Sequence, residues 1–423
     1  MSGIPVAVLV TLNTKAVEAE FVCRKLESHG CAPFIVDLSL RPHDVAGAEI
    51  SGGDLAAAAG STWDEMAAMD RAGASETMIA GASNLFRDRL DAGTLAGAIS
   101  IGGANGTAMG CALMRELPLY FPKIMVSAVA ATAAVQWFIG ESDIVMFPTI
   151  GDTALNRVTG RVMENASAAV AAMARVWVEN RNRPRIDQPP LVAVSSFGGT
   201  AQCVDRVTEL LVGHGFEVIH FHASGPGGRA LEALTAKGEI AGVVDVTTHE
   251  LTDLVVDGVY SAGDGRLRAA GAAGIPQVVV PGAIDHSNFW VGQIPPQFQS
   301  REFFKFNANN MLMRTDAEEF AKLGQLMAER LNAARGPFVV MIPTRGFSEH
   351  TKRKTHDIDG RDAGLWSKPE VDRVFTETLR RGLKKGRVEE LDLHISDPEF
   401  ADACVAAFVE MMAETQQVRS DGR

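Results

Sequence analysis

Residues 97–114 read GAISIGGANGTAMGCALM, and this stretch decides the fold class. Its apolar run 98–101 is typical of a buried strand, residues 102–107 are typical of a tight turn, and a helical pattern follows. A strand that passes through a glycine-rich turn directly into a helix is half of a βαβ unit. The stretch therefore predicts a parallel α/β sheet with this turn at its carboxyl edge.

The same alternation continues along the chain. In the first half we expect helices over 14–28, 50–90 and 156–180 and strands near 5–12, 33–37, 97–101, 123–129 and 143–150. In the second half we expect helices over 316–334, 369–385 and 397–414 and strands near 191–195, 217–222, 242–246, 277–280, 338–342 and 389–395. The pattern predicts an α/β protein of two Rossmann-like domains, with mostly parallel sheets and a cleft between them.

A proline-rich segment separates the two halves. Residues 181–190 read RNRPRIDQPP, and three prolines within residues 184–190 interrupt both helical and strand periodicity. We therefore expect an N-terminal Rossmann-like domain at 1–183, a linker at 184–190 and a C-terminal Rossmann-like domain at 191–423.

Composition narrows the class of protein. The 423 residues include 40 Lys and Arg against 52 Asp and Glu, a formal net charge of −12. This acidic balance argues against binding to nucleic acid or to a membrane surface, both of which favour basic patches. No basic leader and no credible membrane span are present, so we expect a cytoplasmic protein. The five cysteines form no CxxC pair, so they predict neither a zinc site nor a disulfide framework.

Glycine-rich turns follow three of the expected strands. In such turns backbone N–H groups approach an anion closely, and the following helix adds its partial positive charge. The turns contain neither GxGxxG nor GxxxxGK[ST], so neither motif identifies the ligand, and one such turn alone is more often simple turn geometry. We predict phosphate contacts from Gly102, Gly103, Asn105, Gly106 and Thr107, from Gly198, Gly199 and Thr200, and from Ser224, Gly225, Gly227, Gly228 and Arg229. The third turn carries the strongest prediction, because an arginine can bind phosphate through two N–H groups.

Two aspartates follow other strands. Asp152 comes after the strand near 143–150 and would hold Mg²⁺ bridged to a phosphate, or would cap a helix that begins near Leu155. Asp285 precedes His286, and a carboxylate can orient an imidazole for base catalysis. Adjacent residues rarely pair in this way, which favours a role in ordering a loop.

Thr247 and Thr248 end the strand near 242–246. Their hydroxyl groups are candidate contacts to ribose or phosphate, and either residue is also a candidate N-cap for the following helix. His249 and Glu250 come next and are acid–base candidates.

Segments spread along the chain resemble a known family: 11–21 (TLNTKAVEAEF), 102–127 (GGANGTAMGCALMRELPLYFPKIMVS), 139–158 (IGESDIVMFPTIGDTALNRV), 221–234 (FHASGPGGRALEAL), 245–258 (DVTTHELTDLVVDG), 282–290 (GAIDHSNFW) and 309–315 (NNMLMRT). They are similar to the ATP-binding inhibitory domain of the tomato mosaic virus resistance protein and to its bacterial relatives. The resemblance implies two Rossmann-like domains, ATP as a cofactor and a homodimer, but no settled reaction.

The resemblance also bears on one motif and one partner. Asn13 stands before Thr14 and Lys15 where many relatives have Asp, which weakens a metal or base role there and leaves Lys15 as a phosphate contact. The plant protein has a further barrel-like domain, so a comparable partner of this chain would be a separate polypeptide.

Three functions follow from these observations. The leading hypothesis is an ATP- or nucleotide-binding protein of undetermined reaction, with Mg²⁺ as a candidate companion. A second is a transferase or hydrolase with two Rossmann-like domains that acts on a phosphorylated or nucleotide-linked small molecule. A third is a dimeric interaction module that nucleotide stabilises.

Overall fold

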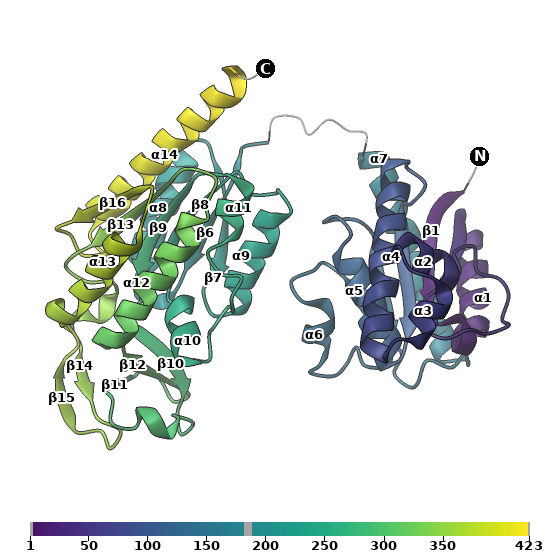
Figure 1. The fold of residues 1–423 in the computed structure, drawn as a ribbon, viewed down its shortest axis with the longest axis horizontal. Helices are drawn as coiled ribbons and strands as arrows, with labels where there is room; N and C mark the ends of the chain where they lie inside the picture. The colour runs from purple at the N-terminus through teal and green to yellow at the C-terminus, as the bar shows by residue number, and fades with distance from the viewer. Residues whose placement is uncertain (1–2, 182–187, 422–423) are drawn as a thin grey trace. The chain divides into compact units, whose positions relative to one another are not determined.

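A computed structural model describes residues 3–181 and 188–421, and these residues form two units of α/β structure (Figure 1). The first unit spans residues 1–186 and the second spans residues 187–423. Residues 184–187 of the expected linker lie outside the described residues.

The first unit is a parallel sheet of five strands in the order β2-β1-β3-β4-β5. Its elements are β1 Ile4–Val10, α1 Leu12–Ser28, β2 Cys31–Asp37, α2 Gly52–Ala58, α3 Trp63–Ala68, α4 Arg71–Asp91, β3 Gly97–Gly102, α5 Ala104–Arg115, β4 Lys123–Ser127, α6 Val135–Ile139, β5 Val145–Pro148 and α7 Thr159–Asn180. Helices α1 and α7 cover one face, and α2, α4 and α5 cover the other.

Alternation along the strands explains these two layers. In β1, Val6 and Val8 pack toward α1 and α7, whereas Ala7 and Leu9 pack toward the opposite helices. The helical stretch expected over 50–90 is three helices, because each begins at its own capping side chain. Ser51, Thr62 and Asp70 accept hydrogen bonds from the third residue of α2, α3 and α4.

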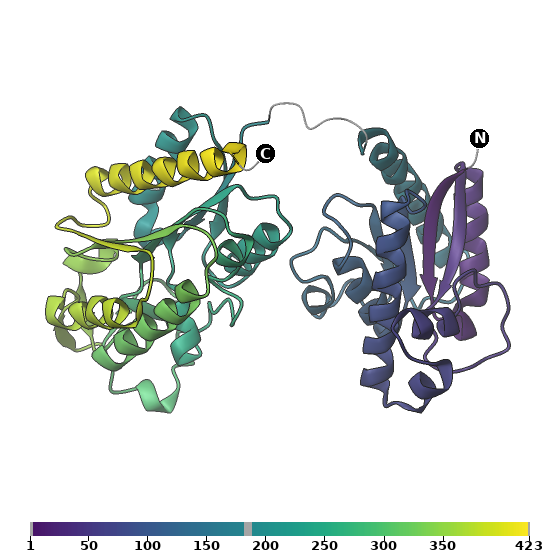
Figure 2. The ribbon, with the colours of Figure 1, turned by 45° about the horizontal axis from the view of Figure 1, so that its top comes forward.

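The second unit contains a parallel sheet of six strands in the order β16-β13-β9-β8-β6-β7. Its elements are β6 Leu191–Ser196, α8 Ala201–Gly213, β7 Glu217–His222, α9 Pro226–Ala236, β8 Gly242–Thr247, α10 Glu250–Val256, α11 Ala269–Ala273, β9 Gln277–Gly282, β10 His286–Trp290, β11 Phe303–Lys305, β12 Asn310–Arg314, α12 Ala317–Asn332, β13 Phe338–Pro343, β14 Lys354–His356, β15 Asp362–Leu365, α13 Pro369–Gly382, β16 Arg387–Leu391 and α14 Pro398–Asp421. Helices α8 and α14 cover one face, and Figure 2 shows the long α14 crossing it in yellow. Helices α9 to α13 pack on the opposite face.

A small antiparallel sheet is the part of this unit that sequence patterning does not predict. Its strands run in the order β10-β12-β11-β14-β15, and it has its own apolar cluster around Phe289, Phe303 and Met313. Strand β10 begins at His286 and has the sequence HSNFW, so its polar first half hides the alternation typical of a strand. The loop expected over 285–288 is therefore largely a buried strand.

The two parallel sheets confirm the predicted fold class of two Rossmann-like α/β units. None of the helices within residues 3–181 and 188–421 has the length and apolar character needed to cross a bilayer.

Candidate functional site

The strand order of the first unit shows where a ligand is expected. Strand β1 lies between β2 and β3, so the connections leaving β1 and β3 diverge to opposite sides of the sheet. Open parallel sheets bind ligands in the crevice at the carboxyl ends of two such strands. In this unit that place is the space between the end of β1 and the end of β3.

A pocket of about 500 Å³ occupies this place. We call it the β1/β3 pocket; it is lined by Thr11, Asn13, Thr14, Lys15, Ser39, Leu40, Arg41, Arg71, Gly103, Ala104, Asn105, Gly106 and Met109. The structure therefore brings together Lys15 and the glycine-rich turn 102–107, two predictions made from separate parts of the sequence.

The start of α5 gives this pocket its backbone donors. A Cβ atom on Gly102 would lie 2.6 Å from the Cα of Gly106, so glycine is what allows the strand end to contact the helix start. The N-cap residue is Gly103, which has no side chain to accept from the first-turn N–H groups. Two exposed residues follow, Ala104 and Asn105, and both line the pocket. The partial positive charge of a 12-residue helix thus faces the space where a ligand would bind.

Three cationic side chains line the same pocket: Lys15, Arg41 and Arg71. The guanidinium of Arg41 donates to the carbonyl oxygens of Leu40 (2.8 Å) and Met69 (3.1 Å), which fixes its position. No Asp or Glu is among the lining residues in the described part of the unit. The pocket therefore combines helix N–H groups with a local excess of positive charge on an acidic protein, the combination expected of an anion site.

Asp152 lies on an exposed loop near this pocket. Its carboxylate accepts from the N–H of Thr153 at 2.6 Å, which together with the nearby Lys15 ammonium holds the pKa of Asp152 below its ordinary value. The alternative role as a helix cap is wrong, because α7 begins at Thr159 and the side chain of Asn156 accepts from the N–H groups of Val158 and Thr159. Within the described residues, no group of three or more His, Cys, Asp or Glu is arranged to hold a metal.

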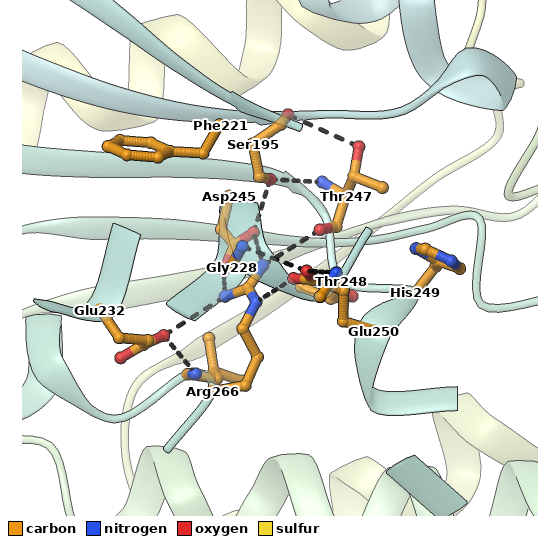
Figure 3. A network of polar contacts seen from close by, with 12 residues as sticks. Ser195, Phe221, Gly228, Glu232, Asp245, Thr247, Thr248, His249, Glu250 and Arg266 are labelled. Carbon is orange, nitrogen blue, oxygen red and sulfur yellow. Dashed lines mark hydrogen bonds and ion pairs between the residues drawn. The ribbon is translucent and has the colours of Figure 1, made fainter. Parts of the chain in front are cut away.

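The carboxyl edge of the second unit contains a buried ionic network instead (Figure 3). Arg266 is 1% exposed and donates to both carboxylate oxygens of Asp245 at 2.6 Å and to Glu250 at 2.7 Å. Glu232 lies 3.4 Å from the same guanidinium. Burial opposes the charge on Arg266, but the neighbouring carboxylates raise its pKa well above the ordinary value. This network holds helix α9, strand β8 and the start of α10 to the loop that precedes α11.

Glu250 also fills the glycine-rich turn for which the phosphate prediction was strongest. Its carboxylate accepts from the N–H of Gly225 at 2.7 Å and of Gly228 at 3.1 Å. A Cβ atom on Gly228 would lie 2.0 Å from this carboxylate, so the glycine makes room for Glu250 and not for an external ligand. The two N–H groups expected to bind phosphate therefore bind an anion of the same chain, and Glu250, one of two acid–base candidates, has structural partners here.

The predicted hydroxyl donors are also used within the protein. Thr107 lies 2.6 Å from the Ser127 hydroxyl, and Thr200 lies 2.7 Å from the Thr247 hydroxyl. Thr248 donates to the carbonyl of Val280 at 3.0 Å, so it caps no helix. These buried hydroxyl groups tie the segments that follow β3, β6 and β8 to the neighbouring strands β4, β8 and β9. Ser224 and Arg229 are half-buried around α9, and Gly198 and Gly199 line a separate small pocket of the second unit.

The Asp285 and His286 side chains pair with each other, contrary to the expectation from their adjacency. Asp285 Oδ1 lies 3.1 Å from His286 Nδ1, while its other oxygen accepts from Ser348 (2.7 Å) and from the indole of Trp366 (2.8 Å). These two extra donors fix the carboxylate beside the imidazole. Burial lowers the pKa of His286, and burial together with the His286 side chain lowers the pKa of the neighbouring His350 to about 4.

These two histidines predict a loss of stability in acid. Because the folded-state pKa values lie below the ordinary value of about 6.5, the unfolded chain takes up protons first. Their contribution to stability is full above about pH 6.5 and is lost as the pH falls toward 4. We expect the free energy of opening of β9, measured by hydrogen exchange corrected for intrinsic rates, to fall between pH 7 and pH 5.

The variant His350→Gln should make this pH dependence shallower, and the exposed His214→Gln should leave it unchanged. Equal slopes for all three proteins would contradict the role given to His350.

Family comparisons agree with the two-unit organisation. Models of the uncharacterised protein family UPF0261 match residues 5–179 for its N-terminal domain and residues 189–412 for its C-terminal domain. The chain belongs to the UPF0261 family. It is 34% identical to a UPF0261 protein of Clostridium tetani over 96% of this chain and 98% of that protein. It is 36% identical to a UPF0261 protein of Rhizobium meliloti over 95% and 97%.

This UPF0261 chain is also 37% identical to the ToMV resistance protein Tm-1(GCR237) of Solanum lycopersicum, over 78% of this chain and 43% of that protein. The predicted family resemblance is therefore confirmed. Within the UPF0261 chain, the cationic pocket residues that the sequence analysis does not predict are Arg41 and Arg71. Arg71 begins α4 and Arg41 follows β2, and no glycine-rich turn adjoins either residue to draw attention to it.

Proposed function

We propose that this UPF0261 chain binds ATP through the first unit, with the phosphate chain in the β1/β3 pocket. The observation that carries this proposal is the meeting of Lys15, Arg41 and Arg71 with the uncapped start of α5 at the carboxyl edge of a parallel sheet. Each of these features favours negative charge, and together they match the three or four charges of a nucleoside triphosphate.

The size of the pocket supports a nucleotide over a lone phosphate ion. Small-molecule sites usually enclose about 300–1,000 Å³, and the β1/β3 pocket of about 500 Å³ lies within that range. In the proposed complex the N–H groups at the start of α5 bind one phosphate group. The arginines neutralise the remaining oxygens, and Lys15 contacts the phosphate chain from the start of α1.

Asp152 gives this site a candidate metal contact. Mg²⁺ is commonly held by one or two carboxylates together with phosphate oxygens, so an isolated aspartate beside a phosphate site is sufficient. Lys15 contributes, after the hydrogen bonds from Thr153, to lowering the pKa of Asp152, which supports a role for this carboxylate beside the proposed site. Mg²⁺ should therefore strengthen ATP binding in the wild-type protein and strengthen it less in Asp152→Asn.

Binding of ATP is tested by calorimetry and thermal melting of the full chain. We expect ATP and pyrophosphate to bind with heat release and to raise Tm. The variant Lys15→Met should weaken the affinity for each of these two ligands about tenfold or more. Lys25→Met is the matched control, because Lys25 lies on the same helix but pairs with Glu164 at 2.7 Å and does not line the pocket. Raising the salt concentration should weaken binding, as expected for contacts between exposed charges.

Two results would contradict the proposal. One is the absence of heat or Tm shift with ATP, ADP or pyrophosphate, with and without Mg²⁺. The other is equal weakening by Lys15→Met and Lys25→Met, which would place the nucleotide elsewhere. Chromatography of the recovered nucleotide then separates a binding protein, which returns ATP intact, from an enzyme that converts it.

A further inference from the structure

The second unit contains a separate small pocket at the carboxyl end of β6. Its volume is about 190 Å³, well below the size of the β1/β3 pocket. We call it the β6 pocket; it is lined by Phe197, Gly198, Gly199, His222, Tyr260, Asn288, Phe306, Asn307, Asn310, Leu312 and His350. The walls therefore come from the turn after β6, from the end of β7, from the loop after α10, from the antiparallel sheet and from the segment 347–352.

The chemistry of these walls differs from that of the phosphate site. Aromatic rings, three carboxamides and two imidazoles line the β6 pocket, and no Lys, Arg, Asp or Glu is among its lining residues in the described chain. The Phe197 ring stacks on His249 at 4.2 Å between centroids and meets Tyr260 edge-on at 6.1 Å. Flat aromatic surfaces with neutral polar groups favour a planar ligand that has a hydrogen-bonding edge and no phosphate.

One residue that lines this pocket has a buried nitrogen without a hydrogen-bond partner. His350 is 2% exposed, and its Nδ1 atom has no hydrogen-bond partner among the described residues. The imidazoles of His286 and His249, which lie in succession behind it at 5.3 Å and 5.6 Å between ring centroids, each have one such nitrogen as well. Buried nitrogen atoms of this kind cost stability unless something satisfies them. A ligand in the pocket would supply the partner for His350.

Hydrogen bonds within the protein fix two of the three carboxamides, those of Asn288 and Asn310. The backbone N–H of Asn288 donates to Asp253 at 2.7 Å, and its side-chain oxygen lies 3.1 Å from His249 Nε2. Its NH₂ group donates to the Asn310 oxygen at 3.2 Å, so the NH₂ group of Asn310 takes no part in this chain of bonds. Asparagine carboxamides paired with a flat aromatic wall are the means by which proteins commonly recognise heterocyclic bases.

We propose that the β6 pocket binds an uncharged nitrogen heterocycle of the size of a nucleobase. The ring lies against Phe197 and Phe306, and its polar edge hydrogen-bonds to Asn310 and His350. Burial lowers the pKa of His350 to about 4, so its imidazole is neutral at pH 7 and offers one donor and one acceptor. This site is independent of the phosphate site in the first unit.

The test uses the full chain with adenine, cytosine and uracil as separate probes, and with phenol and glucose for comparison. We expect ligand-observed NMR and calorimetry to detect at least one of the three bases and neither comparison compound. Bound base should also shift the ring ¹⁵N signals of His350. Phe306→Ala should weaken binding at least fivefold, and its ring is 49% exposed, so the fold should tolerate the change. His350→Gln should weaken binding about tenfold, whereas the exposed His214→Gln should not.

Three outcomes would overturn the proposal. One is that none of the bases binds, and another is that phenol or glucose binds as tightly as the bases. The third is that Lys15→Met weakens base binding as much as His350→Gln does, because the base would then bind in the first unit. Pyrophosphate binding is measured in the same samples, so failure of the base site and failure of the phosphate site are distinguishable.

Discussion

Replacing Arg266 with methionine should lower the free energy of unfolding of the second unit by about 3–5 kcal/mol. The guanidinium is the common partner of Asp245 and Glu250, both fully buried, and the substitution leaves these two carboxylates without their cation. Methionine fills a similar volume, so the loss reflects charge and not a cavity. Hydrogen exchange of strand β8 measures the effect within this unit alone.

Two comparisons make this prediction specific. Arg268→Met should cost less than about 1 kcal/mol, because that side chain is half-exposed and lies 3.9 Å from Glu329. The loss of unfolding free energy caused by Arg266→Met should be smaller at pH 5, where the unpaired carboxyl groups can take up protons. A cost below about 1 kcal/mol at pH 7 would show that the network is not needed to hold the strand ends together.

Replacing Asn105 with aspartate should weaken pyrophosphate binding by on the order of 100-fold while leaving the fold as stable as before or more so. Asn105 is the second residue of α5 and lines the β1/β3 pocket. A carboxylate there stabilises the helix by about 0.3–1 kcal/mol. The same carboxylate repels a phosphate about 5–6 Å away by about 3 kcal/mol at an effective dielectric constant of about 20. Binding and stability should thus change in opposite directions, which no general loss of structure can imitate.

The control variant has the same net charge as Asn105→Asp but carries the added charge elsewhere. Gln136→Glu adds one negative charge on an exposed position of the first unit outside the pocket, and it should change pyrophosphate affinity less than twofold. Calorimetry gives the affinities and thermal melting gives the stabilities. Unchanged affinity in Asn105→Asp would exclude the start of α5 as the phosphate site.

The glycine-rich turn of the β1/β3 pocket could be predicted because the sequence pattern that indicates it is local. A glycine-rich turn between a strand and a helix carries its own geometry, so residues 102–107 could be interpreted without knowing what surrounds them. Lys15 also lies just after a strand, but the family resemblance, and not a local pattern, predicts its contact with phosphate. Arg41 and Arg71 have no such local signature. Their presence in the pocket depends on how the segment 38–70 folds back over the carboxyl edge, which no short pattern records.

The second unit shows how a correct local pattern can still mislead. Residues 224–229 do form an anion-binding turn, but the anion is Glu250, which lies 22 residues after Gly228 and is brought close by the sheet. The antiparallel sheet was missed for a related reason. His286 and Asn288 are polar residues in a buried strand, and only partners from distant segments explain why they can be there.

Because Glu250 occupies the 224–229 turn, any free anion must compete with it for the same N–H groups. Glu250 is tethered to its own receptor, so its effective concentration at the turn is on the order of millimolar or higher whatever the composition of the surroundings. A free anion that displaced Glu250 would also break the ion pair between Glu250 and Arg266. Both groups are buried, so little water is present to screen the charges left unpaired. Glu250 therefore acts as a built-in competitor that keeps the turn occupied. Phosphate in solution should not bind to this turn of the second unit.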